Sequence, residues 1–95
     1  MKTEKQLQDY MKKEANKHHV GFYKLECVGQ TGFPDVMLVY KGYVVFVELK
    51  SPAGTGRISP RQELMIDRLR YQGVPVYVCD NKELADEIIE SIINR

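Results

Sequence analysis

The chain has 95 residues, which suits a single compact domain over residues 1–95 and leaves no room for a second core. Its hydrophobic fraction of 43% and charged fraction of 28% argue against both a disordered chain and a membrane protein. A formal net charge of +1 argues against a protein that coats nucleic acid by bulk electrostatics alone, but it does not exclude local basic patches. The polar start Met1–Gln6 precedes no apolar signal segment, so we expect an intracellular, cytoplasmic protein.

Local patterns predict three helices and four strands in the order α-β-β-β-α-β-α. Apolar residues at helical spacing indicate the helices, and alternating or β-branched runs indicate the strands. The expected elements are a helix over 3–18, strands over 22–28, 36–40 and 43–47, a helix over 59–72, a strand over 74–79 and a helix over 80–92. Residues 51–57 form a loop of glycine, proline and small residues that permits close approach to a ligand.

Each predicted helix begins at a capping pattern, in which a short polar side chain precedes Glu or Gln by three positions. The pairs are Thr3 with Gln6, Ser59 with Gln62, and Asp80 with Glu83. Gly21 ends the first helix and Gly73 ends the second. The strand over 74–79 is expected to be central or next to the sheet edge, with a proline near its beginning.

The cysteines and histidines do not indicate a metal site. Cys27 and Cys79 are far apart, lack a CxxC neighbour and lie in strand-like runs, so we expect both to be buried. His18 and His19 are adjacent on the first helix and therefore point in different directions.

The geometry of the predicted hairpin places two carboxylates opposite each other. If Lys41-Gly42 is a two-residue turn, Asp35 lies directly opposite Glu48 on the neighbouring strand. Lys50 follows Glu48 by two positions and therefore shares its face of the sheet. Cross-strand carboxylates repel unless a cation lies between them, and Mg²⁺ prefers such oxygen ligands. An alternative is a turn aspartate after Pro34 and a separate surface pair of Glu48 with Lys50.

The same residues resemble a known nuclease signature. Gly32-Phe33-Pro34-Asp35, a twelve-residue gap and Glu48-Leu49-Lys50 resemble the bipartite motif of the PD-(D/E)xK nuclease superfamily. With the downstream Ser59-Pro60-Arg61-Gln62, the small size and the element order, the chain resembles the stand-alone VRR-NUC domain. This resemblance implies a restriction-endonuclease-like α/β fold, an αβββαβ core whose mixed sheet is flanked by helices, followed by a C-terminal helix.

The resemblance also implies roles for individual residues. Asp35 and Glu48 match side-chain metal ligands, and the backbone carbonyl of Leu49 matches a third. Lys50 matches the catalytic lysine, which we interpret as positioning water and stabilising charge. Glu4 matches a helix-one glutamate that binds the metal directly or through water, and Gln62 matches a glutamine lining the site. Each also has a simpler explanation. Glu4 would stabilise the helix dipole in the first turn of its helix, and Gln62 would be the capping partner of Ser59.

The implied activity is Mg²⁺-dependent hydrolysis of DNA phosphodiester bonds, with Mn²⁺ as a substitute, leaving 5′-phosphate and 3′-hydroxyl ends. Stand-alone members of the family are associated with homodimers and with resolution of four-way (Holliday) junctions, so branched or duplex DNA is the expected partner. Two alternatives remain open: a nuclease acting on flap, single-stranded or RNA substrates, and a non-catalytic nucleic-acid-binding module.

Overall fold

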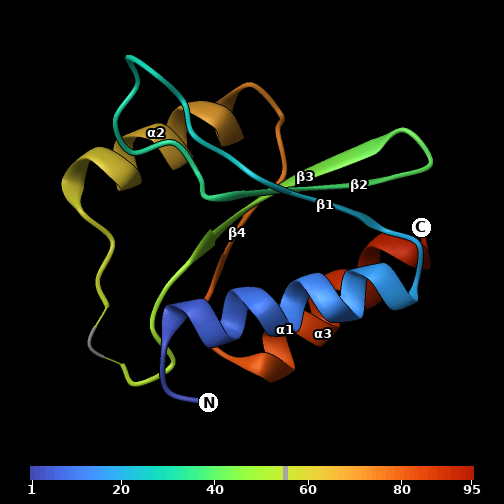
Figure 1. Cartoon of the computed structure of the whole chain (residues 1–95). Coiled ribbons are helices and arrows are strands. Elements are labelled where there is room, and N and C mark those ends of the chain that lie inside the picture. Colours follow the sequence, from blue (N-terminus) through green and yellow to red (C-terminus); the bar gives the residue numbers. More distant parts are fainter. Residues whose placement is uncertain (55) are drawn as a thin grey trace.

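The computed structural model describes residues 1–54 and 56–95 and places three helices beside one four-stranded sheet (Figure 1). The helices are α1 (Glu4–Lys17), α2 (Pro60–Tyr71) and α3 (Lys82–Ile93), and the strands are β1 (Gly21–Lys24), β2 (Val36–Tyr40), β3 (Tyr43–Leu49) and β4 (Val76–Cys79). The predicted element order is therefore confirmed. Thr55, within the loop predicted over 51–57, lies outside the described residues.

The sheet is mixed, with the strand order β1-β2-β3-β4. The β1–β2 and β2–β3 pairs are antiparallel, whereas β3 and β4 run parallel. Lys41 and Gly42 form the turn between β2 and β3, with φ values of 48° and 82°, and Tyr40 pairs with Tyr43 as the two-residue turn requires. The predicted register is thus confirmed along the hairpin.

Two expectations about the other strands are wrong. The strand predicted over 22–28 ends at Lys24, because its next residues would pair with Asp35 and then with Pro34. Proline has no N–H to offer a ladder, so pairing stops there. The β4 strand is an edge strand, neither central nor next to the edge. Within residues 1–54 and 56–95 it pairs with β3 alone, and an edge position tolerates the neighbouring Pro75.

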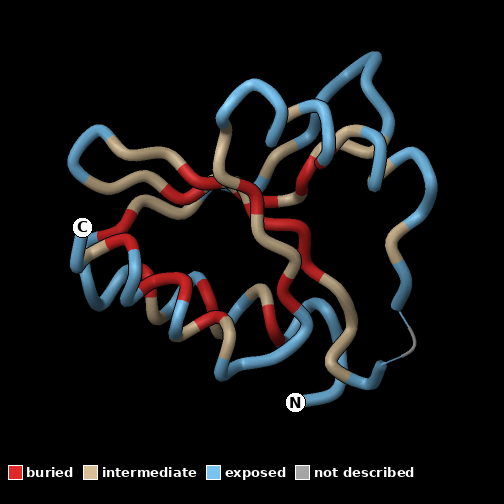
Figure 2. Tube along the Cα trace, turned by 180° about the vertical axis from the view of Figure 1, so that it is seen from behind, coloured by how far each residue is buried: buried red, intermediate tan, exposed pale blue. Residues whose placement is uncertain are grey.

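The helices cover both faces of the sheet, as Figure 1 shows. α1 and α3 pack together against one face, and the fully buried residues gather between them and the sheet (Figure 2). This core includes Leu7 and Met11 of α1, Ile88 of α3 and Val45 and Leu49 of β3. α2 lies over the opposite face and has a single buried residue, so the second layer is thin. No helix in the described part of the chain has the length and apolar character needed to cross a membrane.

Several local expectations are corrected at the ends of elements. α3 is capped by Asn81, whose side chain accepts the Leu84 N–H at 2.7 Å, and not by Asp80. The strand before α3 ends at Cys79, so Asp80 serves as the link. α1 ends at Lys17, before Gly21, which already belongs to β1.

The cysteines differ in environment. Cys79 is buried as expected, whereas Cys27 is exposed because the chain has left the sheet before reaching it.

Candidate active site

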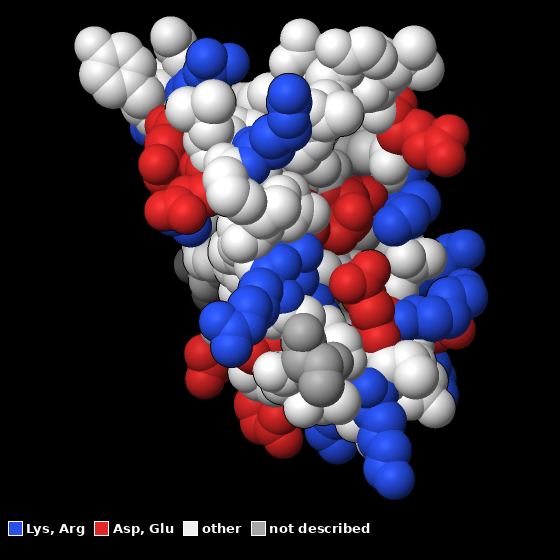
Figure 3. All heavy atoms as spheres, turned by 90° about the vertical axis from the view of Figure 1, so that its left-hand side faces the viewer, with Lys and Arg blue, Asp and Glu red and all other residues white. Residues whose placement is uncertain are grey.

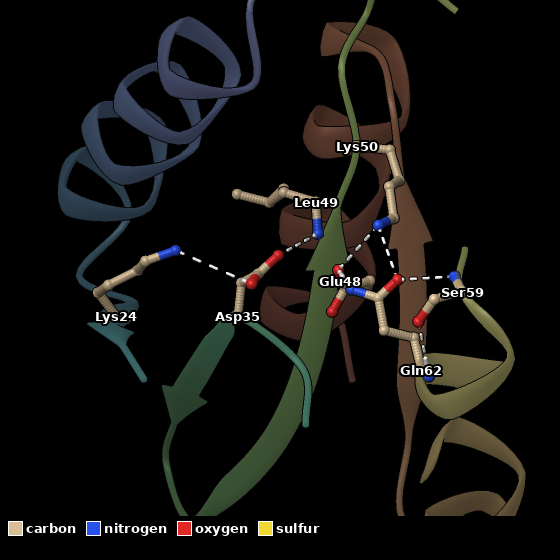
Figure 4. A network of polar contacts seen from close by, with 7 residues as sticks. All are labelled: Lys24, Asp35, Glu48, Leu49, Lys50, Ser59 and Gln62. Atoms are coloured by element: carbon tan, nitrogen blue, oxygen red, sulfur yellow. Dashed lines mark hydrogen bonds and ion pairs between the residues drawn. The ribbon is translucent and has the colours of Figure 1, made fainter. Parts of the chain in front are cut away.

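Asp35 and Glu48 lie at the end of the hairpin furthest from its turn. Asp35 immediately precedes β2 and Glu48 is the penultimate residue of β3. The ladder ends at the pair Val36 and Val47, and one further step along it sets the two acidic residues opposite each other. The Asp35 Oδ2 atom accepts the backbone N–H of Leu49 at 3.1 Å, which fixes this carboxylate beside β3 (Figure 4).

Residues 32–34, just before Asp35, are held by contacts with β3 and with α2. The Phe33 ring meets Phe46 of β3 edge to face, with centroids 5.4 Å apart, and Pro34 is buried. Gly32 has a φ of +87° and lies so close to α2 that a Cβ atom there would be 2.6 Å from the Arg61 carbonyl oxygen. Glycine is thus required both by its backbone angle and by the space available.

Glu48 is the buried charged residue of the site. Its side chain is 1% exposed. One oxygen, Oε2, accepts the Gln62 Nε2 at 2.8 Å and lies 3.4 Å from Lys50 Nζ. The other, Oε1, is buried and has no hydrogen-bond partner among the described residues. Burial, and then the charge of Asp35, raise the pKa of Glu48 to about 7, while Lys50 opposes this rise.

Lys50 and Gln62 complete a small polar network. Lys50 Nζ donates to Gln62 Oε1 at 2.9 Å. The same oxygen accepts the backbone N–H of Ser59 at 2.9 Å, and the Gln62 N–H donates to Ser59 Oγ at 3.2 Å. Gln62 is therefore both the capping residue of α2 and a direct neighbour of Glu48 and Lys50. Figure 4 shows both sets of contacts on this one side chain.

Glu4 is not gathered into this group. It lies exposed in the first turn of α1, and within the described residues no three His, Cys, Asp or Glu side chains are close enough to hold a metal ion. The start of the chain nevertheless lies next to the site, because Ser51 Oγ donates to the Lys2 carbonyl at 3.1 Å. The structure thus brings Asp35, Glu48, Leu49, Lys50 and Gln62 together and leaves Glu4 at the periphery.

Lys24 lies near the site although it belongs to none of the sequence motifs. Lys24, the last residue of β1, places its Nζ 3.9 Å from Asp35 Oδ1. Its position depends on the pairing of β1 with β2, in which Lys24 faces Val36. No pattern within residues 21–24 could have indicated this approach.

Two surface cavities differ in the charge of their walls. A cavity of about 150 Å³ between residues 29–31 and α2 is lined by Arg61 and Arg68. Arg61 also donates to Thr31 Oγ1 at 3.0 Å, which joins this cavity to the segment before Asp35. A cavity of about 350 Å³ between α1 and α3 is lined by three acidic residues, and Asp35, Glu48 and Lys50 are not among its lining residues. Of the two, only the arginine-lined cavity has a charge that suits a polyanion.

Comparisons with known proteins identify the family and the fold of the chain. A solved structure described as "VRR_NUC domain" superposes with a TM-score of 0.82 at 27% sequence identity, covering 95% of this chain and 97% of that one. No curated protein matches the chain. The family model of the VRR-NUC domain matches residues 2–83. VRR-NUC domains are nucleases, which implies a nucleic-acid substrate and supports a hydrolase. The chain therefore belongs to the VRR-NUC family and has its nuclease-type α/β fold.

Proposed function

We propose that this VRR-NUC domain is a divalent-metal-dependent DNA endonuclease that hydrolyses phosphodiester bonds, with Mg²⁺ as its cofactor and Mn²⁺ as a substitute. The observation that carries the proposal is the buried Glu48 carboxylate, whose Oε1 has no partner among the described residues. Lys50 approaches the other oxygen, Oε2, and a buried carboxylate oxygen without a partner is costly unless a cation meets it. Asp35 adds a second negative charge beside it, so the pair has the donors and the need for a hard cation.

The chain offers ligands that fit Mg²⁺. Asp35 and Glu48 would supply carboxylate oxygens, and Leu49 would supply its backbone carbonyl. Mg²⁺ commonly takes only one or two carboxylates from a protein and retains several waters. Glu4 begins α1 two residues after Lys2, whose carbonyl accepts the Ser51 hydroxyl, and would bind such a water. When bound, the cation polarises the phosphate and lowers the pKa of the attacking water.

Lys50 is suited to hold water and stabilise charge. Its ammonium group has three donors. Gln62 Oε1 accepts one of them at 2.9 Å, and Glu48 Oε2 lies 3.4 Å from the same nitrogen. The remaining donor capacity would serve the reacting phosphate or its water. Because the side chain is only 13% exposed, the ammonium is held in one place. Lys50 therefore acts by positioning and not by removing a proton.

Replacing Lys50 separates these two roles. Lys50→Ala is expected to lower kcat by about 10²–10³-fold, as removal of a preorganised cationic donor does. Lys50→Arg, which keeps the charge and cannot act as a base at ordinary pH, is expected to retain clearly more activity than the alanine variant. The measurement is kcat for both variants across a pH series. An arginine variant as inactive as the alanine variant would contradict the positioning role.

Cutting both strands of a duplex, or resolving a branched junction, requires two sites to act together. One site makes one cut, so resolving a four-way junction calls for two copies of this chain. A homodimer with twofold symmetry would match the symmetry of the junction. The arginine-lined cavity beside α2 provides a contact for a flanking phosphate in either duplex or branched DNA.

The substrate class is tested with labelled four-way junction, flap, duplex and single-stranded DNA and with RNA, each in Mg²⁺, Mn²⁺ or EDTA. We expect junction cleavage in both metals, none in EDTA, and none by Asp35→Ala in any condition. Sedimentation of the active protein is expected to give twice the chain mass of 11.0 kDa.

Other outcomes of the panel separate the alternatives. Preferred cleavage of flap, single-stranded DNA or RNA by a monomer would replace the junction assignment but keep the metal site. DNA binding without cleavage in either metal would identify a non-catalytic binding module. Cleavage that persists in EDTA, or in Asp35→Ala, would overturn the metal site itself.

A further inference from the structure

Lys24 approaches the carboxylate pair from a third strand. It ends β1, and the next N–H, that of Leu25, donates to the Asp35 carbonyl at 2.8 Å. This bond ties the end of β1 to the backbone of Asp35. The Lys24 side chain then extends toward Asp35 Oδ1, 3.9 Å away (Figure 4).

Two lysines thus lie on opposite sides of the carboxylates. Figure 4 shows Lys24 beyond Asp35, and Lys50 beyond Glu48 next to Gln62. Their environments differ. Lys50 donates a hydrogen bond to Gln62 and is 13% exposed. Lys24 is 48% exposed, and its 3.9 Å separation from Asp35 is too long for a hydrogen bond. Lys24 is attracted to Asp35 but its ammonium donors are not committed to it.

The site opens to solvent on the side of Lys24. Exposure of the side chains rises from 1% at Glu48 to 25% at Asp35 and 48% at Lys24. A phosphate that enters from this more exposed side meets Lys24 beside Asp35, whereas Glu48 and Lys50 lie at the more buried end. On the face carrying the loop after β3, basic and acidic side chains are interspersed (Figure 3). That face therefore offers a phosphate individually placed cations more than a broad positive surface.

We propose that Lys24 binds the reacting phosphate of the substrate from the side opposite Lys50. The inference rests on the proposed nuclease function and adds a second cationic contact to the same site. When Asp35 serves as a metal ligand, its attraction for Lys24 weakens, and the ammonium donates to a phosphate oxygen instead. The phosphate is then held between two lysines as negative charge develops on its oxygens.

The test compares Lys24→Ala and Lys24→Arg with a matched control, Lys17→Ala. Lys17 forms a similarly exposed pair with Glu14, at 59% and 20% exposure, on α1. With Mg²⁺ and labelled junction DNA, Lys24→Ala is expected to lower kcat/KM by about 10-fold or more. Lys24→Arg is expected to retain most of the wild-type kcat/KM. The kcat/KM of Lys17→Ala is expected to equal that of wild type. Both alanine variants should have nearly wild-type melting temperatures, since exposed ion pairs contribute little.

Two further measurements exclude a purely structural role. The Mg²⁺ concentration that half-maximally stabilises the protein against heat should not rise in Lys24→Ala. A rise that accounts for the whole loss of activity would mean that Lys24 only orients Asp35, and would overturn the proposal. The slope of log affinity against log salt, measured by anisotropy with labelled junction DNA in Ca²⁺, should fall by about one phosphate contact.

Failure of the nuclease function gives a distinct result. If the wild type binds DNA but cuts none of the substrates, the proposed function fails, and the anisotropy comparison still decides about Lys24. Equal affinity and equal salt slope in wild type and Lys24→Ala would then overturn the phosphate contact. If the wild type neither binds nor cleaves DNA, both proposals are overturned.

Discussion

Replacing Glu48 with glutamine is expected to abolish metal-dependent cleavage and to make the metal-free protein more stable at neutral and higher pH. The cleavage rate should fall by about 10³-fold, because one of the two proposed carboxylate ligands is lost. The gain in stability comes from removing a buried charge whose Oε1 has no partner among the described residues. Glutamine retains an oxygen that can accept the Gln62 Nε2.

The pH dependence follows from the direction of the Glu48 shift. Burial and Asp35 raise its pKa from 4.5 to about 7, so the folded state binds this proton more tightly than the unfolded chain does. The resulting stabilisation is complete below pH 4.5 and is lost as the pH rises through 7, by about 3 kcal/mol in total. The glutamine variant lacks this decline. At about pH 8 its free energy of unfolding should exceed that of wild type by about 1–3 kcal/mol, or about 5–15 °C in Tm.

Thermal melts in EDTA across pH check this expectation. Wild type and Glu48→Gln should differ least near pH 4.5, where the wild-type carboxyl is protonated, and most above pH 7. Added Mg²⁺ should then raise the Tm of wild type at high pH but not that of the variant. A glutamine variant less stable than wild type at high pH in EDTA would show that Glu48 is retained for stability and not for metal binding.

Gly32→Ala is expected to destabilise the fold and lower activity at the same time. The residue has a φ of +87°, which costs alanine about 1 kcal/mol or more. Its new Cβ would also lie 2.6 Å from the Arg61 carbonyl oxygen and 2.9 Å from the Gln62 nitrogen. Both are backbone atoms in the first turn of α2, so the helix must move. We expect a loss of about 2–4 kcal/mol in the free energy of unfolding.

Gly29→Ala is the matched control for this substitution. Gly29 lies in the same loop with a φ of +81°, but a Cβ there would meet nothing within 4 Å. Gly29→Ala therefore has the same cost of a positive φ but no steric clash. Urea denaturation should therefore give a loss of about 1 kcal/mol for Gly29→Ala, and its kcat should stay near wild type. Equal losses in the two variants would mean that the contact between Gly32 and α2 does not position Gln62.

The sequence indicates the parts of the site that depend on local geometry. A two-residue turn at Lys41-Gly42 sets the register of the hairpin, and the register sets Asp35 against Glu48. Strand alternation then places Lys50 on the side of Glu48, where its Nζ is found 3.4 Å away. These relations hold between residues close in the chain, so periodicity and turn length determine them.

Other parts depend on how distant segments pack, which local patterns do not encode. The burial of Glu48 results from the approach of α2, fourteen positions further along at Gln62. The approach of Lys24 results from β1 pairing with β2. The early end of β1 arises because its partner segment contains Pro34, although its own residues favour a longer strand. In each case the deciding residue lies on another element.

The amide of Gln62 limits what evolution or design can place at that position. A helix cap of this type accepts either glutamine or glutamate. The site accepts only an amide, because one end must receive hydrogen bonds from Ser59 and Lys50 while the other donates to Glu48. Glutamate would satisfy the helix and set a third carboxylate beside Asp35 and the buried Glu48. Two residue types therefore suit the helix cap but only one suits the site, so the same side chain that begins α2 also orders the polar network around Glu48.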